Sequence, residues 1–168
     1  MEAKAKILGH PIHQMLIVFP LGLLATSLIF DILYLVTGDA TWTMVATYLI
    51  GAGIIGGLIA AVFGIVDWIA IPDGTRAKSV GLWHGAGNVL VVLLFIASWF
   101  IRLPAPGAPV AILLSFVAVA VSMVTAWLGG ELVDRLGVGV SEGAHLDAPS
   151  SLQSPDPGQF RRPTPEPR

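Results

Sequence analysis

Four long apolar runs without a single lysine or arginine limit the fold of this chain more than any other feature. They cover about residues 15–36, 44–71, 82–101 and 109–130. Each run has at least 20 residues, and a helix rising 1.5 Å per residue needs about 20 to cross the roughly 30 Å hydrocarbon core of a bilayer. Barrel strands would be about 10 residues long with alternating polarity, a pattern that these runs lack. We therefore expect an all-α, polytopic membrane protein with four transmembrane helices.

The composition agrees with a bilayer as solvent. Hydrophobic residues make up 55% of the chain and charged residues 12%, whereas soluble proteins carry roughly 25% charged residues. The net charge of -2 gives no reason to expect a nucleic-acid partner. The chain has no cysteine, which excludes disulfides, thiolate metal sites and iron–sulfur clusters held by this chain.

Short connections rich in turn-forming residues separate the runs, which predicts an up-down-up-down antiparallel bundle within residues 1–140. Residues 141–168 hold six of the 12 prolines and no apolar period, so we expect a disordered tail there. Positive residues favour the cytoplasmic side of a membrane. Five flank the runs on the side of the termini and only Arg102 on the other, so we expect both termini to be cytoplasmic, in the inner membrane of a bacterium: Lys4, Lys6, Arg76, Lys78 and Arg135.

Small residues form a stripe on the second run. Gly53, Gly57 and Gly64 lie on one helix face, where the lack of side chains lets a neighbouring helix come close. We expect these glycines to pack against another helix. The same register continues to Asp67, which should therefore point into the bundle rather than toward lipid.

Ionisable groups gather at the end of the bundle that carries the termini, and such groups are functional candidates at membrane depth. The opposite end has Asp31 alone at that depth. We expect a site with His10, His13 and His84 as metal ligands and with Asp67, Asn88 and Glu131 as additional ligands or as partners of the ligands.

Three interpretations of this group remain open. A histidine of the first helix could face His84 and bind one b-type haem, or the histidines and a carboxylate could bind a transition-metal ion. The polar groups could also be purely structural, in an accessory membrane subunit without a cofactor. A proton or ion pathway is the third, but the hydroxyls between the two ends more often bond to their own helix backbone.

Three separated motifs resemble one family of bacterial inner-membrane proteins, catalogued as domain of unknown function 2231. They are His10-Pro11-Ile12-His13 with Phe19-Pro20, the stretch Trp83-His84-Gly85-Ala86-Gly87-Asn88, and Leu128-Gly129-Gly130-Glu131-Leu132-Val133 with Gly137-Val138-Gly139-Val140. The resemblance covers about residues 7–140. Gln14, Asp134 and Leu136 depart from it, standing where the family usually has Pro, Tyr and His.

The resemblance implies a four-helix membrane protein and supplies no reaction. Relatives thought to be joined to redox modules, or encoded beside them, would favour electron transfer. We expect binding or electron transfer rather than stand-alone enzyme activity. The expected partners are the lipid bilayer and either a redox protein or a second copy of the chain.

Overall fold

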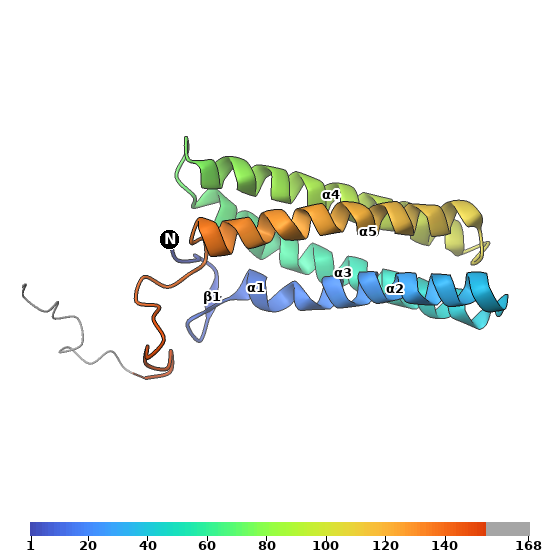
Figure 1. The fold of residues 1–168 in the computed structure, drawn as a ribbon, viewed down its shortest axis with the longest axis horizontal. Helices are drawn as coiled ribbons and strands as arrows, with labels where there is room; N and C mark the ends of the chain where they lie inside the picture. The colour runs from blue at the N-terminus through green and yellow to red at the C-terminus, as the bar shows by residue number, and fades with distance from the viewer. Residues whose placement is uncertain (154–168) are drawn as a thin grey trace, which may run out of the picture.

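The computed structural model describes residues 1–153 and confirms an all-helical bundle (Figure 1). Four of its segments are long and apolar enough to cross a membrane. The first consists of two helices in line, α1 (Ile12–Leu16) and α2 (Val18–Thr37). The others are α3 (Thr41–Ile69), α4 (Arg76–Arg102), and α5 (Pro109–Gly130), which continues into a π-helical turn η1 (Glu131–Arg135).

The helices pack as a square. Each of α2 and α4 contacts both α3 and α5, so α2 and α4 lie on one diagonal. The apolar core enclosed by the four helices is formed by Leu24, Ile50, Ile54, Val91, Phe95 and Ala118. The N-terminus and residues 136–153 lie at one end, which we call the terminal end, and the α2–α3 and α4–α5 connections lie at the far end (Figure 1).

Pro20 explains the interruption between α1 and α2. A proline has no N–H, so Pro20 cannot donate to the carbonyl four residues earlier, and the ladder breaks near that point. Ile17 stands at the break, and its own N–H donates to the carbonyl oxygen of His13 at 3.1 Å. The first span thus has a distinct terminal segment that carries His13.

Two features of the fold were not expected from the sequence. Helix α4 begins at Arg76 rather than near residue 82, because Thr75 caps it by accepting a hydrogen bond from the Lys78 N–H at 3.1 Å. A short hairpin of β1 (Lys6–Ile7) and β2 (His10–Pro11) precedes α1, which the sequence did not indicate. Residues 141–153 form turns without helix or strand, and the rest of the expected tail, residues 154–168, lies outside the described residues.

Candidate functional site

His13 is held against helix α3 by its ring. Its Nδ1 lies 2.8 Å from the carbonyl oxygen of Ala60. A carbonyl can only accept, so Nδ1 donates to it, and in the neutral ring Nε2 then keeps its lone pair. The ring lies over Gly64, where a Cβ atom would come within 2.8 Å of Cε1. Gly64 thus provides the space that lets this imidazole pack on the backbone of α3.

His84 has the same arrangement in the other pair of helices. Its Nδ1 lies 2.8 Å from the carbonyl oxygen of Thr125, and its ring edge faces Gly129 on α5. The side-chain nitrogen of Asn88 lies 3.2 Å from Nε2 and 3.5 Å from Nδ1 of His84. Nearly equal distances to both ring nitrogens place this amide over the face of the ring rather than in line with the Nε2 lone pair.

The structure brings His13 and His84 to the same level and separates His10 from them. His13 lies on α1 and His84 near the start of α4, so both are at the terminal end of their spans. His10 lies in β2, is exposed, and has its Nδ1 3.1 Å from the carbonyl oxygen of Leu8. Within residues 1–153, no three His, Asp or Glu side chains come together in a group that could hold a metal ion.

The two acidic candidates have other partners. Asp67 accepts hydrogen bonds from the N–H groups of Lys4 and Ala5, at 2.7 and 3.1 Å, and so ties the N-terminal segment to the end of α3. Glu131 forms an ion pair with Arg76, with 2.6 Å between the charged atoms. These contacts join the segments of the terminal end to one another.

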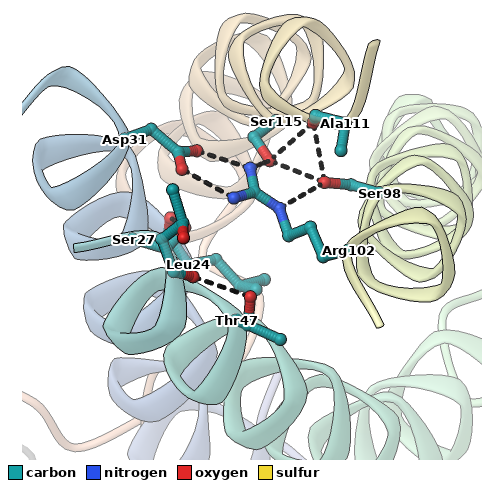
Figure 2. Close-up of polar contacts among 9 residues, drawn as sticks. Leu24, Ser27, Asp31, Thr47, Ser98, Arg102, Ala111 and Ser115 are labelled. Atoms are coloured by element: carbon teal, nitrogen blue, oxygen red, sulfur yellow. Dashed lines mark hydrogen bonds and ion pairs between the residues drawn. The ribbon is translucent and has the colours of Figure 1, made fainter. Parts of the chain in front are cut away.

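The far end contains a site that the sequence analysis missed. Asp31 does not stand alone there, because it forms a fully buried ion pair with Arg102, the last residue of α4, across the bundle (Figure 2). Both guanidinium NH groups donate to the carboxylate, each at 2.7 Å. Arg102 also donates to the hydroxyls of Ser98 and Ser115, each at 3.1 Å. The bidentate geometry satisfies both oxygens of the buried carboxylate.

Hydroxyls between the two ends do not connect them. Those of Ser27, Ser122 and Thr125 donate to carbonyl oxygens three residues earlier in their own helices. Such bonds satisfy the hydroxyl within its own helix. In the part of the chain that the structure describes, the two polar sites are therefore separated by the apolar core.

Four long apolar helices, packed around an apolar core, define the class of the protein as a polytopic integral membrane protein. The chain belongs to the family described as "Predicted membrane protein (DUF2231)", whose model matches residues 9–142. This match confirms the resemblance drawn from the sequence motifs. Neither the curated proteins nor the solved structures include a match to this chain.

Proposed function

We propose that His13 and His84 together bind a redox cofactor at the terminal end and that the protein transfers electrons there. The observation that carries the proposal is the matched pair of Nδ1–carbonyl hydrogen bonds, both 2.8 Å long. A hydrogen bond of this kind fixes the tautomer and the orientation of a metal-ligating histidine. Each ring then presents Nε2 as the atom that can bind iron or another metal.

The number of ligands favours a b-type haem over a bare metal ion. Haem iron needs only two axial ligands from the protein, and two histidines can supply them. A transition-metal ion in a protein usually takes three or four side-chain ligands, and within residues 1–153 no such group exists. Helices α2 and α4 lie on one diagonal of the bundle, and α1 is in line with α2. His13 on α1 and His84 on α4 therefore lie on opposite sides of the bundle axis.

The charge distribution supports placing this site at the cytoplasmic face of the inner membrane. Among the described residues, Arg102 is the one basic residue of the far end, and it is buried in its ion pair. The terminal end carries the five other basic residues among residues 1–153. An excess of basic residues favours the cytoplasmic side of the membrane for that end. The chain has no cysteine, so Asp39→Cys and Asp73→Cys would each carry the only thiol. A membrane-impermeant maleimide should label Asp39→Cys in spheroplasts and Asp73→Cys only after lysis.

Purification in mild detergent tests the cofactor. Absorption spectra of the oxidised and dithionite-reduced protein should show a Soret band and sharp reduced-state bands, and elemental analysis should find iron. His13→Ala and His84→Ala should each abolish these bands. His10→Ala is the matched control, since His10 is exposed and away from the pair, and it should leave the spectrum unchanged.

Two results would contradict the proposal. The first is a His84→Ala protein with the same spectrum and metal content as the original. The second is a colourless, metal-free protein after growth with added haem and metals. That second result would favour an accessory membrane subunit without a cofactor. The Asn88 amide supports this alternative, because it packs over the face of the His84 ring and fills space next to Nε2.

A further inference from the structure

Helices α2 and α4 bury equivalent residues. The same separation of 71 positions joins Leu24 to Phe95, Ser27 to Ser98, and Asp31 to Arg102. These are all the buried residues of α2, and each has a buried counterpart in α4. The same separation also joins His13 to His84. The inward face of the first span is thus repeated, residue by residue, in the third.

Helices α3 and α5 show a second constant separation, of 65 positions. It joins four buried residues of α3 to four buried residues of α5: Ala46 to Ala111, Ile50 to Ser115, Gly53 to Ala118, and Ala60 to Thr125. It also joins Gly64 to Gly129. A repeated order of buried positions is the mark of a repeated structural unit.

The contacts are repeated along with the residues. His13 bonds to the carbonyl of residue 60 and lies over Gly64, while His84 bonds to the carbonyl of residue 125 and lies over Gly129. The two histidines are related by the separation of 71 positions, and their carbonyl and glycine partners are related by the separation of 65 positions. Chance similarity of two apolar helices would not reproduce a histidine, its carbonyl partner and its glycine platform together.

The arrangement of the helices has the matching symmetry. Helix α2 packs on α3 as α4 packs on α5, and α3 contacts α4 as α5 contacts α2. A rotation by half a turn about the long axis of the bundle would exchange the members of both pairs of contacts. His13 and His84 form an equivalent pair near one end, and Asp31 and Arg102 form one near the other.

We infer that the chain consists of two copies of one helical hairpin, residues 12–69 and 76–135, joined face to face. The surface between them is an interaction surface whose natural partner is a hairpin of the same kind. Asp31 and Arg102 are equivalent positions with opposite charges. Two first hairpins would bring two carboxylates together, and two second hairpins would bring two guanidinium groups together, so the ion pair selects one hairpin of each type. This inference does not depend on any cofactor.

The equivalence of positions 31 and 102 predicts that their aspartate and arginine can be exchanged. An arginine at position 31 would find Ser27 one turn earlier, as Arg102 finds Ser98. The second hydroxyl partner, Ser115, has Ile50 as its counterpart, so the exchanged arginine would lack that one hydrogen bond. Exchanging Ile50 and Ser115 as well would rebuild the whole network in the opposite orientation.

The experiment compares four full-length variants in detergent by Tm and by size-exclusion profile. D31R and R102D should each lower Tm by about 10 °C or prevent recovery of a monodisperse protein. D31R/R102D should regain at least half of this loss, and D31R/R102D/I50S/S115I should come within about 3 °C of the original.

The inference is overturned if both exchanged variants are as unstable as the single ones, or if the single variants are as stable as the original protein. In the first case the two positions are not equivalent, and in the second the charges do not select the pairing. Because the ion pair and the histidine pair lie at opposite ends, a failure here is distinct from the absence of a cofactor.

Discussion

Replacing Arg102 by methionine should strongly destabilise the far half of the molecule. Arg102 and Asp31 are both 0% exposed, and the guanidinium group supplies two hydrogen bonds of 2.7 Å to the carboxylate. Removing one partner of a buried ion pair leaves the other charge uncompensated and costs about 3–5 kcal/mol. Ser98 keeps its 2.7 Å bond to the carbonyl of Ala111, so the loss comes mainly from Asp31.

The double variant D31L/R102M shows how much the ion pair itself contributes to the free energy of unfolding, apart from the loss caused by one unpaired charge. Replacing a buried pair by apolar side chains is often neutral or stabilising, so the double variant should unfold within about 1 kcal/mol of the original protein. Unfolding in mixed detergent and dodecyl sulfate, followed by the fluorescence of the five tryptophans, measures both variants. Our reasoning fails if R102M loses less than about 1 kcal/mol, or if the double variant is as unstable as R102M.

Three further predictions concern the terminal end and one connection. Gly64→Ala should lose about 1–3 kcal/mol in the same unfolding assay, because the new Cβ would meet the His13 ring, whereas Gly85→Ala, with nothing within 4 Å, should be nearly neutral. Asp67→Ala should speed hydrogen exchange at the two amides of the N-terminal segment that it accepts from, and equal exchange rates would contradict that role. The backbone N–H at the start of α3 lowers the pKa of Asp39. The stabilisation from this carboxylate is therefore present above its unfolded-state pKa and lost as the pH falls through its folded-state pKa, which an NMR titration would detect as a midpoint below that of a model peptide.

The sequence predicts the spans well because length and hydropathy alone determine them. The fourth span, residues 109–130, coincides with α5, since Pro109 starts it. Helix α4 starts at Arg76, before the apolar run that begins near residue 82, because Arg76 and Lys78 belong to its first turn. Charged residues in the first turn of a membrane helix lie outside the apolar run but inside the hydrogen-bonded helix.

The ion pair escaped prediction for a related reason. Arg102 ends an apolar run and precedes prolines, so it reads as a residue at the membrane surface. Its side chain is long enough to turn back into the bundle and reach Asp31. A usable signal was present, since each of these two charged residues has a serine four positions earlier on the same helix face.

The two ends of the bundle differ in how their polar groups are hydrogen-bonded. At the far end, the groups of the ion-pair network are bonded to one another within the protein. In the middle, hydroxyls bond to their own helices and the core is apolar. The terminal end differs, because His13 has one ring nitrogen held by a carbonyl and the other available. The electron transfer that we propose would accordingly take place at the terminal end, where His13 and His84 lie.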